Sequence, residues 1–296
     1  MKWRYRLIII FLAVILSVFI GISVFLGSSM TRIERVTIEE DPNDLGLEYE
    51  AVTFLSREDK LELHGWHLPS QDDKRIVIMV HGADMHRADP NIDMLGIASD
   101  LVNNGFNLLM FDLRGHGESE GERLSAGYYE TRDLTGAVDF VKTLGYEHIG
   151  VLGFSMGGAT ALMSAAKNSD IDCVVADSSY ADMTEIMKRE FKERSGMPGF
   201  LLPPMLFMVK IMYGVDFNAV KPIEAVPNIS PRPVMFIHGE DDTFVPPEHA
   251  RRLYQASQNP ANELWIAPDS THVKSYINNK EEYINRVTTF LDKALK

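Results

Sequence analysis

A serine flanked by glycines stands where an apolar run gives way to a helical pattern. Ser155 is the centre of Gly-Phe-Ser-Met-Gly (153–157), which follows the apolar run 149–152 and precedes an alanine-rich segment. Between a strand and a helix, this pattern exposes the serine hydroxyl on a sharp turn, and the glycines avoid collisions with neighbouring backbone. We therefore expect Ser155 to be a nucleophile, and an ordinary helix-capping serine is the alternative.

A serine hydroxyl needs a general base, and the chain order of this motif limits the choice of histidine. The acid and then the histidine follow the serine, whereas six of the nine histidines precede Ser155. Of the other three, His238 lies at a predicted strand and His249 in the first turn of a predicted helix. His272 lies in a loop after the predicted strand 264–266, at the edge where such sheets bind ligands. We expect His272 to be the base, with His249 as the alternative.

Several carboxylates could hold the base in place. Glu240, Asp241 and Asp242 follow the predicted strand 234–237, and geometry alone does not separate them. Asp177, after the preceding predicted strand, is a further candidate, and capping of the following turn is its alternative role. The three clustered acids could also bind a cation, but no suitably spaced histidine or carboxylate accompanies them. We therefore expect no metal and no cofactor.

The oxyanion of a tetrahedral intermediate needs preorganised N–H donors. The residue after the nucleophile, Met156, offers one at the start of a predicted helix. The second donor normally comes from the loop after the first central strand, which here is His-Gly-Ala-Asp-Met-His (81–86). We expect the N–H of Ala83 to complete the oxyanion hole, and the N–H of Asp84 is the alternative.

Short apolar runs alternate with helical patterns after residue 50, which predicts an α/β fold. The first two runs are typical of an antiparallel pair at the edge of a sheet. The other runs are typical of strands that are buried on both faces. We expect a mostly parallel sheet of about eight strands with helices on both faces. The predicted strands are 52–55, 61–66, 76–80, 108–111, 149–152, 173–176, 234–237 and 264–266, and the predicted helices are 92–102, 131–144, 159–167, 248–257 and 281–295.

An insertion at about 181–230 interrupts this alternation. Insertions of this size between core strands often cover an active site, so we expect a helical cap. An extra helical pair packed on the body is the other reading. The apolar run 200–209 indicates an acyl or other apolar substrate, although such runs also pack to bury themselves. The residues expected to contact substrate are Phe200, Leu201, Met205, Phe207 and Met208.

The N-terminal segment has the length of a membrane span. Three basic residues precede the uncharged run 7–26, which as a helix is about 30 Å long, the thickness of a hydrocarbon core. A cleaved secretion signal ending near Gly27-Ser28-Ser29 is the alternative. The excess of basic residues before the run predicts a single-pass cell-membrane protein with a cytoplasmic N-terminus (1–6). A stalk (27–50) and an extracytoplasmic catalytic domain (51–296) would follow the transmembrane helix.

The charge of the chain limits its partners. It holds 42 acidic and 29 basic residues, a net charge of −13. Such a chain repels phosphate backbones, so we expect no nucleic-acid partner and instead a small-molecule ester or acyl substrate. Acidic surfaces are also repelled by anionic lipids, so attachment to the membrane would depend on the helix.

Five ordered motifs resemble those of the α/β-hydrolase family. They are His81-Gly82, Phe-Asp-Leu-Arg-Gly-His-Gly-Glu-Ser (111–119), the 153–157 motif, the 238–246 segment with its His-Gly and Val-Pro pairs, and His272. They are most like the serine aminopeptidase and monoacylglycerol-lipase-like group and its membrane-anchored bacterial members. The resemblance covers about residues 50–296 and implies Asp242 as the triad acid, four residues after the histidine of the His-Gly pair. It also implies that Asp112, Arg114 and His116 brace the active-site loops.

Together these features predict a membrane-anchored serine hydrolase that cleaves carboxylic esters, with lipid-like or acyl esters as candidate substrates. Ser155, His272 and Asp242 would act through an acyl-enzyme intermediate. The alternatives are an aminopeptidase or a thioesterase on the same fold, and a catalytically silent surface binding protein. The resemblance does not fix the substrate, because this fold hosts many activities.

Overall fold

Every apolar run predicted as a strand is a strand in the computed structural model, which describes residues 2–70 and 74–296. One sheet contains all of them in the order β1-β2-β4-β3-β5-β6-β7-β8. β2 pairs antiparallel with β1 and β4, and the remaining neighbours are parallel. The strands are β1 Glu50–Leu55, β2 Glu62–Leu68, β3 Arg75–Val80, β4 Asn107–Phe111, β5 His148–Phe154, β6 Cys173–Asp177, β7 Val234–Gly239 and β8 Glu263–Ala267.

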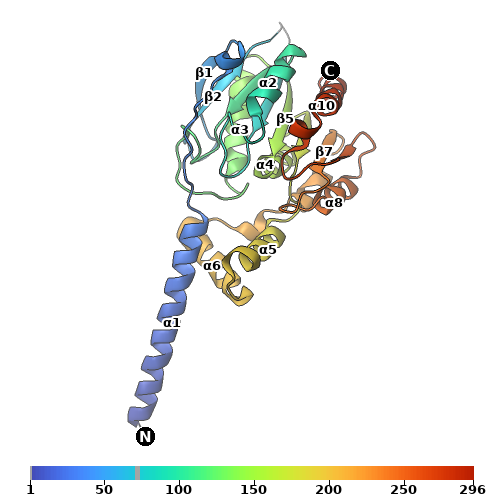
Figure 1. Ribbon diagram of the computed structural model, residues 1–296. Coiled ribbons are helices and arrows are strands. Elements are labelled where there is room, and N and C mark those ends of the chain that lie inside the picture. Colours follow the sequence, from blue (N-terminus) through green and yellow to red (C-terminus); the bar gives the residue numbers. More distant parts are fainter. Residues whose placement is uncertain (1, 71–73) are drawn as a thin grey trace.

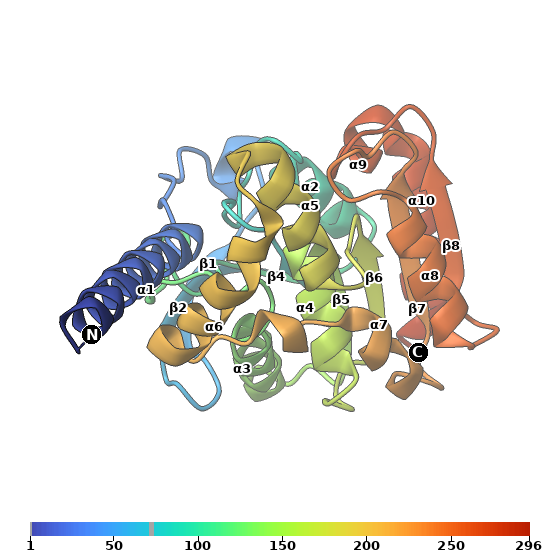
Figure 2. The same ribbon diagram turned by 90° about the horizontal axis from the view of Figure 1, so that it is seen from below.

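Alternating side chains along β3 show why helices cover both faces of the sheet. Ile76 and Ile78 belong to the core shared with α3, α4 and α8, whereas Val77 and Met79 belong to the core shared with α2 and α10. Successive residues of a strand point to opposite faces, so a strand with two apolar faces needs two helical layers. Figure 2 shows these layers. The helices are α2 Met94–Asn103, α3 Glu130–Thr143, α4 Met156–Ala165, α8 Glu248–Ser257, α9 Ser275–Asn278 and α10 Lys280–Ala294. The predicted α/β architecture is confirmed.

The segment predicted as a cap contains two longer helices, α5 Met183–Ser195 and α6 Leu202–Tyr213, and the short helix α7 Pro222–Ala225. Asp182 caps α5 by accepting a hydrogen bond from Thr184 N, and Gly214 ends α6 in the left-handed conformation. In Figures 1 and 2, α5 and α6 lie on the side of the domain from which the N-terminal helix extends.

The N-terminal helix α1, Lys2–Met30, is long and apolar enough to cross a membrane. Its large apolar side chains are exposed from Leu7 to Phe25, as expected for contact with lipid. The helix continues through residues 27–30, which the sequence assigned to the stalk. It does so because its C-terminal turns pack against α6: a Cβ at Gly27 would lie only 2.7 Å from Val209 Cγ2.

The segment after α1 follows the surface of the domain rather than forming a free spacer. Arg32 forms a β-bridge with Arg123. The Arg35 guanidinium donates hydrogen bonds to the carbonyl oxygens of Gly117 and Gly121, at 2.8 and 3.0 Å. These contacts hold the segment after α1 against the loop between β4 and α3.

Candidate active site

Ser155 occupies a strained turn between β5 and α4. Its backbone has φ 51° and ψ −112°, a conformation that residues other than glycine rarely adopt. Ser155 N donates a 2.8 Å hydrogen bond to the carbonyl oxygen of Asp177, at the end of the neighbouring strand. The turn therefore projects the serine side chain beyond the carboxyl end of the sheet.

The two flanking glycines are required by close backbone contacts. A Cβ at Gly153 would lie 2.4 Å from the carbonyl oxygen of Gly157, and a Cβ at Gly157 would lie 2.1 Å from the carbonyl oxygen of Val80. No real Cβ tolerates such distances, so any side chain here would displace α4 from the sheet. This is the steric reason for the spacing of the motif.

The structure brings the side chains of Ser155, His272 and Asp242 together. Ser155 Oγ lies 2.9 Å from His272 Nε2, and His272 Nδ1 lies 2.7 Å from Asp242 Oδ2. Asp242 follows β7 and His272 follows β8. A hydrogen bond of 2.9 Å from Asp241 N to the carbonyl oxygen of Ser270 joins the two loops.

Asp242 is held as a carboxylate. Its Oδ1 atom accepts hydrogen bonds from Phe244 N and Val245 N, at 2.9 and 2.8 Å, and its Oδ2 atom lies 3.2 Å from His238 Nε2. Burial by itself would raise the pKa of Asp242, but the hydrogen bonds from His238 and His272 outweigh burial and lower the pKa to about 2. The carboxylate is thus an acceptor for the imidazole at neutral pH.

The other carboxylates considered from the sequence lie elsewhere. Glu240 and Asp241 are exposed to solvent, whereas Asp242 is buried. Asp177 is also buried, and it accepts a 2.9 Å hydrogen bond from Ser178 Oγ. Burial raises the pKa of Asp177 to about 6. The carboxylate that contacts the imidazole is therefore that of Asp242.

His249, the alternative base, has a different partner. Its Nδ1 atom accepts a 3.2 Å hydrogen bond from Ala181 N, at the beginning of the cap segment. The ring is buried in the first turn of α8. Its contact is therefore with the cap backbone, and His272 is the histidine beside Ser155.

The two backbone groups predicted to bind the oxyanion come from adjoining segments. Met156 opens α4 directly after Ser155, and Ala83 lies in the loop after β3. The two segments touch, because a Cβ at Gly157 would lie 2.5 Å from the carbonyl oxygen of His81. The loop after β3 therefore lies against the beginning of α4.

An apolar cavity of about 530 Å³ lies between the cap helices, the end of α1 and Phe244. Phe244 forms part of its wall, and the Phe244 ring stands edge-on to the His272 ring with centroids 4.9 Å apart. Among the predicted cap contacts, Met205 lines this cavity. Phe207 is instead 62% exposed, because residues two apart on a helix point to different faces. Phe200 lies in a 3-10 turn before α6 and is 68% exposed. The predicted cap contacts outside the cavity wall are Phe200, Leu201, Phe207 and Met208.

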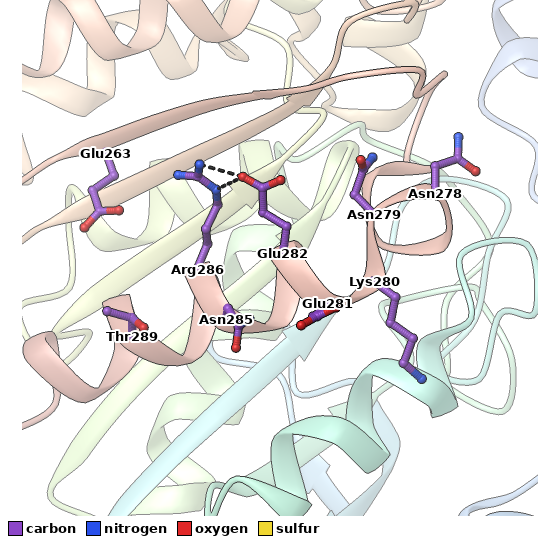
Figure 3. A pocket seen from close by; sticks show the side chains of 9 residues that line it. All are labelled: Glu263, Asn278, Asn279, Lys280, Glu281, Glu282, Asn285, Arg286 and Thr289. Carbon is purple, nitrogen blue, oxygen red and sulfur yellow. Dashed lines mark hydrogen bonds and ion pairs between the residues drawn. The ribbon is translucent and has the colours of Figure 1, made fainter.

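A second concavity, of about 760 Å³, lies over α10 and the first residue of β8, Glu263 (Figure 3). Its wall is polar and includes the ion pair of Glu282 with Arg286, at 2.7 Å. Asn279 connects this region to the candidate site, because its amide donates a 3.0 Å hydrogen bond to the carbonyl oxygen of Pro268. Pro268 begins the loop that carries His272, so the α9–α10 junction supports that loop.

Two residues that touch the site were not predicted as site residues from the sequence. His238 lies against Asp242, and Phe244 lies against His272. The His-Gly pair carried a signal for His238, since it stands four residues before Asp242. Nothing in the sequence distinguished Phe244 from the other aromatic residues.

Comparison with known proteins settles the family. Residues 97–296, more than half of the chain, match the model of the prolyl oligopeptidase family. The chain belongs to this family. The matched range contains β4 to β8 and all three residues of the Ser–His–Asp cluster, whereas α1 lies outside it.

Two relatives and one solved structure extend the match. YqkD of Bacillus subtilis is 33% identical over 236 residues, which cover 78% of this chain and 75% of YqkD. YfhR of Salmonella typhi is 29% identical over 263 residues, 84% of this chain and 83% of YfhR. The structure of the Pyrococcus furiosus esterase Pf2001 has a TM-score of 0.76 and 29% identity, covering 90% of this chain and 99% of the esterase. These matches confirm the resemblance to the α/β-hydrolases, and the protein is a hydrolase of the serine type.

Proposed function

We propose that this protein cleaves carboxylic esters, with Ser155 as nucleophile, His272 as general base and Asp242 as the triad acid. The observation that carries the proposal is the continuous chain of short contacts from Ser155 Oγ to His272 Nε2 and from His272 Nδ1 to Asp242 Oδ2. The strained backbone of Ser155 supports it, because strain of this kind persists where function requires it.

The reaction follows from this geometry. Ser155 Oγ attacks the carbonyl carbon while His272 Nε2 takes the hydroxyl proton, and Asp242 stabilises the imidazolium that forms. The N–H groups of Ala83 and Met156 donate hydrogen bonds to the oxyanion. The tetrahedral intermediate expels the alcohol, which takes the proton from His272, and an acyl-enzyme remains. Water then attacks the acyl-enzyme and gives a proton to His272. His272 returns this proton to Ser155 Oγ as the carboxylic acid leaves, which restores the free enzyme.

We also propose that α1 stays attached and anchors the domain outside the cytoplasm. The three basic residues at the N-terminal end of α1 favour a cytoplasmic N-terminus. Cleavage near residues 27–29 would remove contacts with the cap, such as the 3.1 Å hydrogen bond from Tyr213 Oη to Ser28 Oγ. Intact-mass analysis of the protein extracted from membranes tests this: a mass that includes residues 1–26 is expected, and a protein beginning near Ser28 would contradict it.

A second candidate function is the hydrolysis of amide bonds. Membership of the prolyl oligopeptidase family favours it, whereas the similarity to the esterase Pf2001 favours esters. The same three side chains serve either reaction, so the choice between them depends on the substrate rather than on the triad.

Hydrolysis by the full chain in detergent micelles tests the proposal. We expect p-nitrophenyl acyl esters to be cleaved faster than aminoacyl p-nitroanilides, and Ser155→Ala to lose at least about a thousandfold in kcat. Ser99→Ala, a serine on α2 away from the site, is the matched control and should retain activity. Faster cleavage of the anilides would favour the peptidase, and an active Ser155→Ala variant would refute the nucleophile.

A further inference from the structure

The cap helix α6 and the membrane helix α1 form one packed unit. Gly27 contacts Val209 and Met205, and the close approach depends on the absence of a side chain at position 27. The Arg123 guanidinium lies over the Tyr213 ring at 4.3 Å and also donates a 3.0 Å hydrogen bond to the carbonyl oxygen of Ser28. In both ribbon views α6 lies beside the C-terminal end of α1 (Figures 1 and 2).

The same cap helix exposes apolar side chains at the level where α1 leaves the bilayer. Counted from Leu7 at about 1.5 Å per residue, a hydrocarbon core of about 30 Å ends near Leu26, which packs against the cluster that contains Met205 and Val209 of α6. Phe207 and Ile211 on α6 are both 62% exposed. Exposed apolar surface next to a membrane span is stabilised by contact with the bilayer, so the cap lies at the membrane surface.

The apolar cavity is walled jointly by α1, the cap and the catalytic loop. Leu26 and Met30 come from α1, Met187 from α5, Met205 from α6 and Phe244 from the loop beside His272. Its volume of about 530 Å³ lies within the range of roughly 300–1,000 Å³ that is typical of small-molecule sites. The cavity therefore lies between the end of the membrane helix and Phe244, the residue whose ring contacts His272.

The cavity wall has the chemistry of an acyl-chain site. Glu190 is the one charged side chain among the described residues that line it, and its carboxylate lies 3.2 Å from the Arg189 guanidinium. The same guanidinium donates a hydrogen bond to the carbonyl oxygen of Phe244. The hydrogen bond from Arg189 to Phe244 thus joins α5 to the loop that carries Asp242, and the remaining wall is mainly apolar.

We propose that this cavity holds the acyl chain of an ester drawn from the adjoining membrane leaflet, so that α1 is part of the substrate site as well as an anchor. The substrate class is an amphiphile with a single long acyl chain, whose carbonyl reaches Ser155 while the chain lies between α1 and the cap. This inference rests on the ester hydrolysis proposed above. It adds that long acyl chains are preferred and that residues of the membrane helix set this preference.

The test uses the full chain in phosphatidylcholine vesicles with p-nitrophenyl acetate and p-nitrophenyl dodecanoate as probes. Met30→Trp narrows the cavity from α1, and Met187→Trp narrows it independently from α5. We expect each variant to lower kcat/KM for the dodecanoate relative to the acetate, by roughly tenfold for every two methylene groups that the indole displaces. Phe25→Trp, on the lipid-facing side of the same helix and 71% exposed, is the matched control and should behave as the wild type.

The outcomes separate this inference from the proposed function. A wild-type enzyme that prefers the acetate, or a dodecanoate-to-acetate ratio unchanged in both tryptophan variants, would overturn the acyl site and leave ester hydrolysis standing. A wild-type enzyme that cleaves neither ester would refute both. If one variant fails to fold, the other still tests the acyl site, because the two substitutions lie on different helices.

Discussion

His238 Nε2 lies 3.2 Å from Asp242 Oδ2, the atom that also accepts the hydrogen bond from His272. The His238 side chain is fully buried, and its Nε2 atom lies 2.6 Å from the carbonyl oxygen of Val245. One N–H is therefore shared between this carbonyl and the carboxylate. We therefore expect His238 to act as a positioning residue, which fixes the carboxylate that contacts the imidazole.

Replacement of His238 tests this positioning role. His238→Phe removes the donor, and we expect kcat to fall about tenfold with KM unchanged, since a hydrogen bond to a charged group contributes about 1.5 kcal/mol or more. His238→Gln keeps a side-chain N–H and should restore most of the loss. Steady-state kinetics of the two variants check this. Equal losses in both would indicate that the ring acts only through packing.

The two buried aspartates near the site should differ in their effect on catalysis. Asp242→Asn removes the carboxylate that contacts His272, and we expect kcat to fall by about a thousandfold to ten-thousandfold, as in other triads. Asp177→Asn should retain kcat within about tenfold, because the Asp177 carboxyl bonds to Ser178 rather than to the imidazole. Ester hydrolysis at neutral pH measures both. A larger loss for Asp177→Asn would reverse the assignment of the acid.

Asp177 should also make stability depend on pH. Its pKa of about 6 in the folded chain exceeds the ordinary 3.8 because burial disfavours the charge. The neutral Asp177 carboxyl group therefore contributes its full stabilisation of the folded state below its ordinary pKa. This contribution to the free energy of unfolding is lost as the pH rises through 6. The lost stability amounts to ~3 kcal/mol. The side chain in Asp177→Asn is neutral at every pH. The free energy of unfolding of this variant, relative to that of the wild type, should therefore rise between about pH 4 and about pH 7. Denaturant unfolding at the two pH values measures this, and a constant difference would contradict it.

The contact between α1 and the cap can be tested with two matched glycines. A Cβ at Gly27 would lie 2.7 Å from Val209 Cγ2, whereas a Cβ at Gly21 meets no atom within 4 Å. We expect Gly27→Ile to destabilise the packed unit by about 1–3 kcal/mol through overpacking. Gly21→Ile should match the wild type. Limited proteolysis of the cap and thermal unfolding in micelles report the difference, and equal behaviour of the variants would contradict the contact.

The sheet could be predicted because strands buried on both faces are continuous apolar runs. The run 149–152 gave the position of β5, although the strand extends from His148 to Phe154. The ends of the strands did not follow from the apolar runs, because pairing with neighbouring strands decides where a strand stops. The antiparallel pair β1–β2 was also predicted, from the two short apolar runs 52–55 and 61–66.

The three side chains of the site could be proposed from chain order and strand ends, but the choice among neighbouring acids could not be made from geometry. Glu240, Asp241 and Asp242 are consecutive, and only the folded loop shows that Asp242 turns inward. The family resemblance had selected the same residue. The contact of Phe244 with His272 depends on that loop conformation and left no sequence pattern.

The cap was harder to interpret residue by residue. Nearly every position of 200–209 is apolar, so no polar face marks which side of the helix points to the cavity. Met205 points inward, whereas Phe207 points away. The inward face is set by the packing of α6 against α1, a contact between segments almost 180 residues apart. The helical period of a uniformly apolar run contains no information about it.

Active-site labelling tests the central claim most directly. We expect a fluorophosphonate probe to label the full chain at Ser155, identified by mass spectrometry of the modified peptide, because the hydroxyl is activated by His272. Ser155→Ala should abolish the label, and His272→Ala should slow it severely. Absence of labelling in the wild type, or a label on another residue that persists in Ser155→Ala, would contradict the account.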